Sequence, residues 1–253
     1  MFKDIFASIT SAARKLFTNF GATLIALLLY ALLLLVLYVF FTTGVGTVTH
    51  VLLSLVVLPL AAVVLFFVLQ ALAVSYVRIG VGPGYLLRRA LRDCWKLLLV
   101  SLPLILLAGL LSYGFGWLAG KLDYDQSRAW QGTLLNWSRF VLLYLALPLM
   151  AIHVWLAAVR EGAGAAYRGF FRHLGRAFAP RTVAIYALLF ALFGAAVYGL
   201  LFTRTQFGGA WVEMGLLGGR LALALLLVFV GWLVTLGALA EVTARPAQAE
   251  LEG

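Results

Sequence analysis

The chain has 253 residues, of which 64% are hydrophobic and only 11% are charged, and its formal net charge at neutral pH is +10. A soluble domain is about half apolar and about a quarter charged, and a chain of this length cannot bury so large an apolar excess in one core. The composition therefore excludes an ordinary soluble protein, and the single cysteine, Cys94, excludes an intramolecular disulfide.

Six apolar runs follow one another along the chain, and each is long enough to cross a bilayer as a helix. A transmembrane helix needs roughly 20 mostly apolar residues, and none of the runs alternates like a barrel strand. We therefore expect an all-α integral membrane protein with six transmembrane helices, forming a single transmembrane domain over residues 1–253. The expected spans are about Phe20–Phe41, Val51–Val77, Leu97–Leu118, Phe140–Val159, Val183–Phe202 and Leu221–Ala240.

The nineteen lysines and arginines are divided unequally between the two sides that six spans define. Fourteen lie on the side that holds both termini, and five lie in the three loops of the other side. The positive-inside rule then predicts both termini in the cytoplasm, and we expect a bacterial inner-membrane protein. The basic charge is interpreted as an orientation signal that faces anionic phospholipid, and we do not expect nucleic-acid binding.

An amphipathic segment precedes the first, third and fifth spans. The three segments contain FKDIFASITSAARKLFTNF, GYLLRRALRDCWK and EGAGAAYRGFFRHLGR, and in each of them apolar residues recur at three- and four-residue spacing. This pattern is typical of a helix in the headgroup region, and His173 is expected on the polar side of the third. The basic residues predicted to face lipid headgroups or a partner are Arg14, Lys15, Arg88, Arg89, Arg92, Lys96, Arg168, Arg172 and Arg176.

The three amphipathic segments divide the chain into similar units. Recurring features are a basic residue at separations of 82 and 80 residues (Arg14, Lys96, Arg176), a Gly-x-Gly start (Gly82, Gly162) and a Leu-Pro-Leu element (Pro59, Pro148). We predict three parallel repeats of a surface helix plus a helical pair, over about residues 1–79, 80–160 and 161–241, followed by a short cytoplasmic tail at 242–253. Parallel repeats are related by an axis near the membrane normal.

A few polar or helix-bending residues lie inside the spans. Intramembrane ionisable residues are functional candidates, and a proline frees a carbonyl one turn earlier in its helix. The residues that could line a cavity between spans are Pro59, Gln70, Ser75, Pro148 and His153. The alternative is routine packing, with His153 a neutral histidine bonded to a backbone carbonyl. His153 could also bind a haem or pigment, although no cofactor is expected.

Other patterns favour structural roles. Gly162-Ala-Gly-Ala-Ala-Tyr167 lacks the third glycine and the preceding strand of a dinucleotide-binding motif, so its glycines are expected to turn the chain. The small-residue spacings Gly116–Gly120 and Gly215–Gly219 favour internal helix packing over dimerisation. Asp123 and Asp125 provide too few ligands for a firm cation site. Because no nucleophile–base pair, phosphate loop or metal set is evident, we expect no catalytic residue, no metal and no enzymatic activity.

The run PLMAIHVWLAAVREGAGAAYRGFFRHLGRAF resembles the recurring pattern of bacterial multi-span families related to the membrane domain of glycerophosphodiester phosphodiesterases. In that pattern a span ends in Glu-Gly, here Glu161-Gly162, and an amphipathic helix with arginines and aromatic residues leads into the next span. The catalytic domain of that family has no counterpart in these residues. The resemblance therefore implies membrane architecture and no phosphodiesterase activity.

The main functional expectation is a non-enzymatic polytopic protein that organises the membrane or acts as an accessory subunit. Its amphipathic helices would contact anionic phospholipid, a membrane-protein partner or another copy of the chain. One alternative is a small-solute or lipid permease with a cavity between repeats. The other is a haem- or pigment-binding subunit that uses His153.

Overall fold

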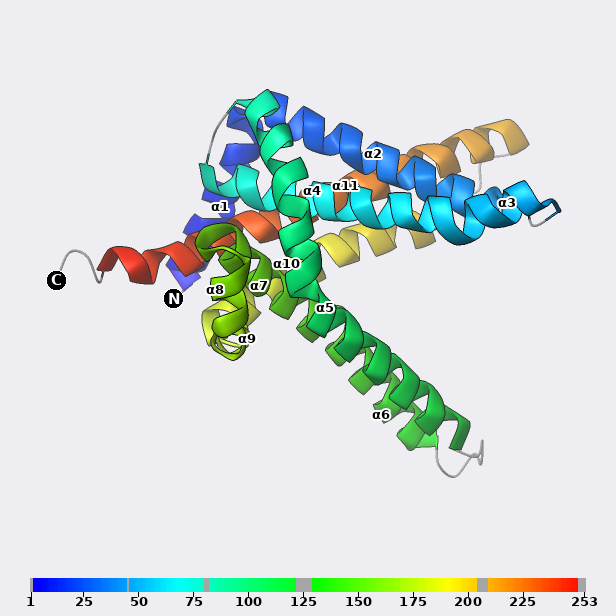
Figure 1. Cartoon of the computed structure of the whole chain (residues 1–253). Coiled ribbons are helices and arrows are strands. Elements are labelled where there is room, and N and C mark those ends of the chain that lie inside the picture. Colours follow the sequence, from blue (N-terminus) through cyan, green and yellow to red (C-terminus); the bar gives the residue numbers. More distant parts are fainter. Residues whose placement is uncertain (1, 45, 80–81, 122–128, 204–208, 250–253) are drawn as a thin grey trace. The chain divides into compact units, whose positions relative to one another are not determined.

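A computed structural model describes residues 2–44, 46–79, 82–121, 129–203 and 209–249, and every regular element in these ranges is a helix (Figure 1). Six helical stretches are long and apolar enough to cross a membrane, which confirms the six predicted spans. They are Phe20–Thr42, Val48–Tyr76, Pro83–Lys121, Trp130–Glu161, Pro180–Phe202 and Trp211–Ala244.

The elements follow the predicted order of surface segments and spans, with two π-helical turns inside spans. They are α1 (Phe2–Thr18), α2 (Phe20–Thr42), α3 (Val48–Leu52), η1 (Leu53–Val57), α4 (Leu58–Ile79), α5 (Pro83–Lys121), α6 (Ala129–Phe140), η3 (Val141–Ala146), α7 (Leu147–Glu161), α8 (Ala163–Arg168), α9 (Phe170–Ala177), α10 (Pro180–Phe202) and α11 (Ala210–Ala249).

Two boundaries differ from the sequence expectation. The second amphipathic segment and the third span form one continuous helix, α5, because no helix-breaking residue lies between them. Helix α11 likewise continues through most of the predicted tail to Ala249, and residues 250–253 lie outside the described residues. By contrast, α1 and α2 are separated at Asn19, which has non-helical backbone angles, and Pro180 begins α10 after a short turn.

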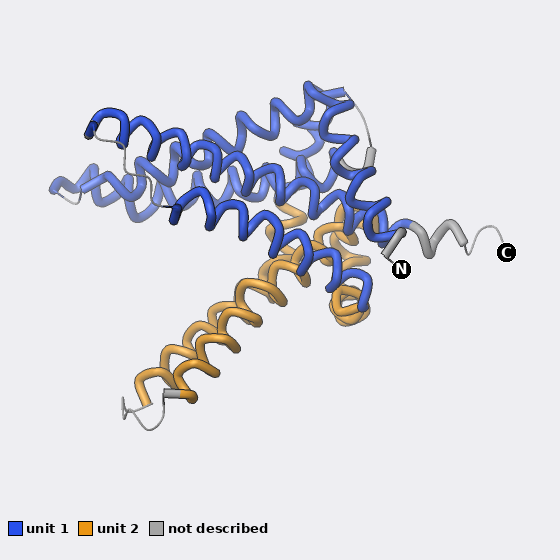
Figure 2. Tube along the Cα trace, turned by 180° about the vertical axis from the view of Figure 1, so that it is seen from behind, with its two compact units in different colours: residues 1–94, 180–253 blue, residues 95–179 orange. Residues whose placement is uncertain are grey.

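The chain forms two compact units, shown in different colours in Figure 2. The first contains Met1–Cys94 and Pro180–Gly253, and the second contains Trp95–Ala179. In the first unit α11 is central, because it packs against α1, α4 and α10, while α2 packs against α4. In the second unit α7 packs against α8 and α9.

Glycine brings helices close together at one place in the first unit. A Cβ added at Gly231 of α11 would lie 2.7 Å from Cγ of Phe193 in α10. The four glycines of the predicted packing motifs differ, since no described atom beyond their own turn of helix lies within 4 Å of a Cβ built on Gly116, Gly120, Gly215 or Gly219. Within each compact unit, the expectation that those motifs make close helix contacts is therefore wrong for the described residues, because all four glycines are exposed.

The two Leu-Pro-Leu elements have the same local backbone. Each proline follows a π-helical turn, η1 before Pro59 and η3 before Pro148. The N–H of Leu58 bonds to the carbonyl of Leu53, and the N–H of Leu147 bonds to the carbonyl of Leu142. A proline has no N–H and its ring displaces the carbonyl one turn earlier, so a wider turn beside it relieves the local conflict.

Candidate functional site

The third amphipathic segment begins at a turn that only glycine makes easily. Helix α7 ends at Glu161, and Gly162 has φ of 87°, the one positive φ found in the described residues. A residue with a Cβ is strained in this left-handed region, although nothing lies within 4 Å of where that Cβ would be. The glycine is therefore required for its backbone conformation, which agrees with the predicted turn.

Helices α8 and α9 are nearly one helix. At Gly169, between them, the N–H of Gly169 bonds to the carbonyl of Ala165 at 2.9 Å, and the N–H of His173 bonds to the carbonyl of Gly169 at 2.9 Å. The four-residue hydrogen-bond pattern thus continues across the junction, so side chains in both helices keep a common helical register.

The combined α8–α9 helix has three sides rather than two. Its packing side is formed by the buried Ala166, His173 and Ala177, with Phe170 half-buried beside them. At about 100° per residue, exposed arginines lie on one flank of this stripe and exposed aromatic residues on the other. The arginine flank is Arg168, Arg172 and Arg176, and the aromatic flank is Tyr167, Phe171 and Phe178.

His173 is buried, with 4% of its surface exposed, and is not on the outward polar side where the sequence placed it. It fits because Gly169 has no side chain: a Cβ there would lie 2.8 Å from Nε2 of His173. Its Nε2 is 3.7 Å from Oε2 of Glu161, too far for a hydrogen bond, and has no hydrogen-bond partner in the structure. The lack of a side chain at Gly169 and the helical register therefore place the His173 imidazole on the buried side of the helix.

Burial lowers the pKa of the His173 imidazole, Glu161 raises it, and Arg172 and Arg176 lower it again, with a net shift downward from 6.5. The imidazole is therefore mostly neutral at neutral pH. The neutral imidazole therefore leaves the positive charge of the arginine flank essentially unchanged.

The start of α5 repeats this arrangement eighty residues earlier. Its buried stripe is Leu86, Ala90, Asp93 and Leu97, which corresponds to Ala166, Phe170, His173 and Ala177. Its cations Arg88, Arg92 and Lys96 correspond to Arg168, Arg172 and Arg176. One difference is the polar residue of the stripe, where a carboxylate in α5 occupies the position of the imidazole in α9. Another is the aromatic flank, because leucines occupy the positions of Tyr167, Phe171 and Phe178 in α5.

Asp93 neutralises part of the basic surface of α5. The residue is 3% exposed, and its carboxylate oxygens lie 3.4 Å from Nε of Arg89 and 3.9 Å from Nε of Arg92. Arg88 and Arg92 are exposed, whereas Arg89 and Lys96 are half-buried. Two cations of this segment, Arg89 and Arg92, therefore lie near a negative charge of their own helix.

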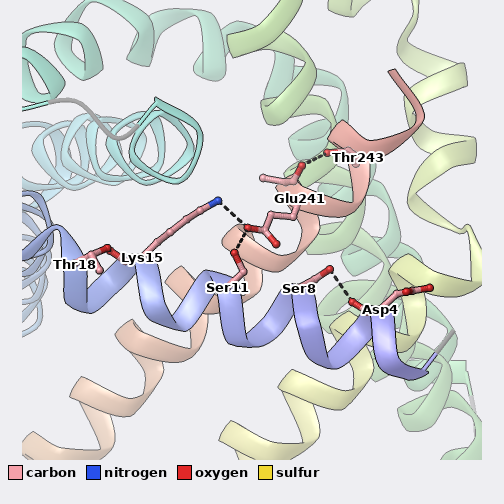
Figure 3. A network of polar contacts seen from close by, with 8 residues as sticks. Asp4, Ser8, Ser11, Lys15, Thr18, Glu241 and Thr243 are labelled. Carbon is pink, nitrogen blue, oxygen red and sulfur yellow. Dashed lines mark hydrogen bonds and ion pairs between the residues drawn. The ribbon is translucent and has the colours of Figure 1, made fainter. Parts of the chain in front are cut away.

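Helix α1 is held to α11 by the network in Figure 3. Nζ of Lys15 lies 2.7 Å from Oε1 of Glu241, and Oγ of Ser11 donates to the same oxygen at 2.5 Å. The hydroxyl of Tyr76 in α4 donates to the carbonyl of Lys15 at 2.5 Å. Of the two predicted surface cations in α1, Lys15 is thus engaged within the chain, and Arg14 is exposed.

The predicted cavity residues belong to both compact units. Pro59, Gln70 and Ser75 lie in the first, and Pro148 and His153 lie in the second. Gln70 accepts a hydrogen bond from Nε1 of Trp232 at 2.8 Å, and the buried Oγ of Ser75 has no hydrogen-bond partner in the structure. Within the first unit, the amide therefore joins α4 to α11.

His153 lies on α7 with 4% of its surface exposed. Its Nδ1 is 3.0 Å from the carbonyl of Leu149, and since a carbonyl only accepts, Nδ1 must carry the proton. This leaves the buried Nε2 as the atom that could bind a haem iron, and it has no hydrogen-bond partner in the structure. No group of three metal-ligating side chains occurs in the described part of the chain, which does not include Asp123 and Asp125.

No known protein family, curated protein or solved structure matches this chain.

Three structural residues were missed from the sequence. Glu241 anchors α1, Trp232 binds Gln70, and Gly231 allows α10 and α11 to approach. A signal existed for Glu241, because it is a carboxylate that follows directly after an apolar span. No signal distinguished Gly231 from the other glycines, since a close approach depends on what the partner helix places opposite.

Proposed function

We propose that this protein is a non-enzymatic inner-membrane protein that organises the membrane or serves as an accessory subunit. The observation that carries this proposal is the outward surface of its basic segments. Each packs by a stripe of mostly small or apolar residues and leaves cations and large apolar side chains exposed together. Exposed aromatic rings beside arginines match the boundary between hydrocarbon and anionic headgroups.

The topology belongs to the same proposal. Three parallel repeats with both termini in the cytoplasm would place all three basic segments on one side of the membrane. The shared burial register of α5 and α8–α9, and the matching π-helical turns before Pro59 and Pro148, support an internal repeat. The resemblance to membrane domains associated with glycerophosphodiester phosphodiesterases is consistent with an architectural role.

The test is to extract the full-length protein with its surrounding bilayer in polymer-bounded discs and to identify the lipids and proteins that remain. We expect anionic phospholipid to be enriched several-fold over the bulk membrane, or a second membrane protein to be present in fixed ratio. Discs prepared from the same membranes with an unrelated six-span protein provide the control. Bulk lipid composition together with no fixed-ratio partner would contradict the proposal.

A lipid permease is the second candidate, and the paired π-helical turns favour it. Such turns are often found at functional sites, and each one here lies beside a proline inside a span. The probe is a fluorescent phosphatidylcholine in vesicles that contain the protein, with dithionite added outside to bleach accessible label. Movement of protected label to the outer leaflet, abolished by Pro59→Ala with Pro148→Ala, would favour the permease over the accessory role.

A further inference from the structure

We propose that the arginine flank of α8–α9, formed by Arg168, Arg172 and Arg176, is the chain's main binding site for the phosphate of anionic phospholipid headgroups. The inference rests on the proposed function and deepens it. It selects one of three basic segments and one class of ligand.

The first support is geometric. The three arginines are spaced by four residues on a helix whose hydrogen bonds continue through Gly169, so they line one flank. All three are exposed, while the opposite side of the helix is buried against α7. Guanidinium groups match phosphate oxygens with paired donors, and adjacent ones can share a single phosphate.

The arginines of the flank are also free of carboxylate partners in the described chain, so their charge can act on a headgroup. No ion pair to Arg168, Arg172 or Arg176 is found in the part of the chain that the structure describes. In α1, by contrast, Lys15 is bound to Glu241, and in α5 Asp93 lies near Arg89 and Arg92. A cation that already faces a carboxylate gains less from a headgroup. Among the described ion pairs, none therefore offsets a charge of the arginine flank, whereas one carboxylate offsets part of the charge in each of the other two segments.

The third support identifies the ligand as lipid. Phe171, on the aromatic flank that adjoins the arginine flank, is 85% exposed, and Phe178 and Tyr167 are exposed on that aromatic flank too. Large aromatic side chains are unfavourable in water but match the hydrocarbon boundary, where the adjoining arginines meet headgroups. In sequence, α8 and α9 lie between two membrane-spanning helices, α7 and α10, which keeps them near the membrane surface.

The register match between α5 and α8–α9 sharpens the comparison. Asp93 corresponds to His173, which lies eighty residues later. A buried carboxylate therefore lies beside the basic residues of α5, and a buried imidazole lies at the same position beside those of α8–α9. The same helical position thus separates a segment with internal charge compensation from one without it. A carboxylate at position 173 should weaken headgroup binding even though every arginine remains.

The experiment titrates phosphatidylglycerol and phosphatidylcholine onto the detergent-solubilised full-length protein and measures bound lipid by native mass spectrometry. The test variant is R168Q/R172Q/R176Q, and the register-matched control is R88Q/R92Q/K96Q, which removes the same charge. We expect about fivefold weaker phosphatidylglycerol binding per arginine removed from α8–α9, and much less for the control. Equal losses in the two variants would overturn the site.

Three further measurements separate loss of charge at this site from other causes. R168K/R172K/R176K should lose less affinity than R168Q/R172Q/R176Q, because the charge remains while the paired guanidinium donors are lost, which separates lost charge from misfolding. His173→Asp should weaken phosphatidylglycerol binding several-fold while His173→Asn does not, and equal effects would contradict the charge argument. Inorganic phosphate should not displace phosphatidylglycerol; displacement would show a soluble-phosphate site instead. If the discs still enrich anionic lipid while R168Q/R172Q/R176Q binds normally, this inference fails and the proposed function survives.

Discussion

At the residue scale, Glu241 shows how one carboxylate can join two helices that lie far apart in the sequence, α1 and α11. Its Oε1 receives both the ammonium of Lys15 and the hydroxyl of Ser11, so a single oxygen contacts two successive turns of α1 (Figure 3). The apolar residues Ile5, Ala12 and Leu16 are buried on the same helix. Polar contacts set the position of α1, and apolar burial holds it there.

Glu241→Gln tests this anchor. The amide can still accept from Ser11, but it loses the charge that attracts Lys15, whose side chain is 48% exposed. Because solvent screens such a pair, we expect docking of α1 to weaken by about 1 kcal/mol. Hydrogen exchange of the α1 amides measures this as about fivefold more frequent opening.

The control for that measurement is Arg14→Gln. Arg14 is exposed next to Lys15 and has no ion pair in the described residues, so its loss should leave α1 exchange unchanged. Equal exchange in the two variants would show that Glu241 does not hold the helix.

At the element scale, the packing of α10 against α11 depends on one glycine that no sequence motif marked. A Cβ on Gly231 would meet Cγ of Phe193 at 2.7 Å, closer than carbon atoms normally approach. The motif glycines of the same helix, Gly215 and Gly219, face no atom within 4 Å. Spacing alone therefore does not identify the helix contact.

Gly231→Ala is expected to destabilise the protein by about 1–3 kcal/mol, because the added methyl group displaces the Phe193 ring. Gly219→Ala on the same helix has open space and should change stability by less than about 1 kcal/mol. Reversible unfolding in detergent mixtures, followed by circular dichroism, measures both. The free-energy cost of Gly231→Ala should be smaller in a Phe193→Ala background than in the native chain. An equal cost in both backgrounds would contradict this contact.

At the scale of the whole molecule, six spans and the charge distribution lead to one topological prediction. With both termini in the cytoplasm, position 47 faces outward and position 92 faces inward. Both residues, Thr47 and Arg92, are exposed in the structure. In a Cys94→Ala background, an impermeant maleimide should label Thr47→Cys in intact cells and Arg92→Cys only after the membrane is opened. Labelling of both from the same side would contradict the topology.

Much of the helical architecture could be predicted from the sequence because it depends on local quantities. Runs of about 20 apolar residues indicate spans whatever they contact, since the bilayer demands internal backbone hydrogen bonds. All six spans were found in this way. The turn at Gly162 could also be predicted, because glycine's conformational freedom is a property of a single residue.

The candidate site was predictable in composition but not in arrangement. The sequence named Arg168, Arg172 and Arg176, yet it assigned His173 to the same outward side. A two-sided amphipathic pattern does not distinguish an exposed aromatic residue such as Phe171 from a packed one. In the structure, small residues and the imidazole face α7, and Phe171 is 85% exposed.

The sequence by itself determined that the chain suits a lipid bilayer, how many helices are long enough to span it, and where the charged residues lie along the chain. These properties depend only on neighbouring residues, because hydropathy and charge are sums over a local stretch. Only the tertiary structure decided which cations are compensated and which helix faces are packed. Glu241 and Lys15 are more than two hundred residues apart, and Gly231 matters only because Phe193 lies opposite it. Such pairings depend on how helices meet, and no local pattern records the residue on the other side.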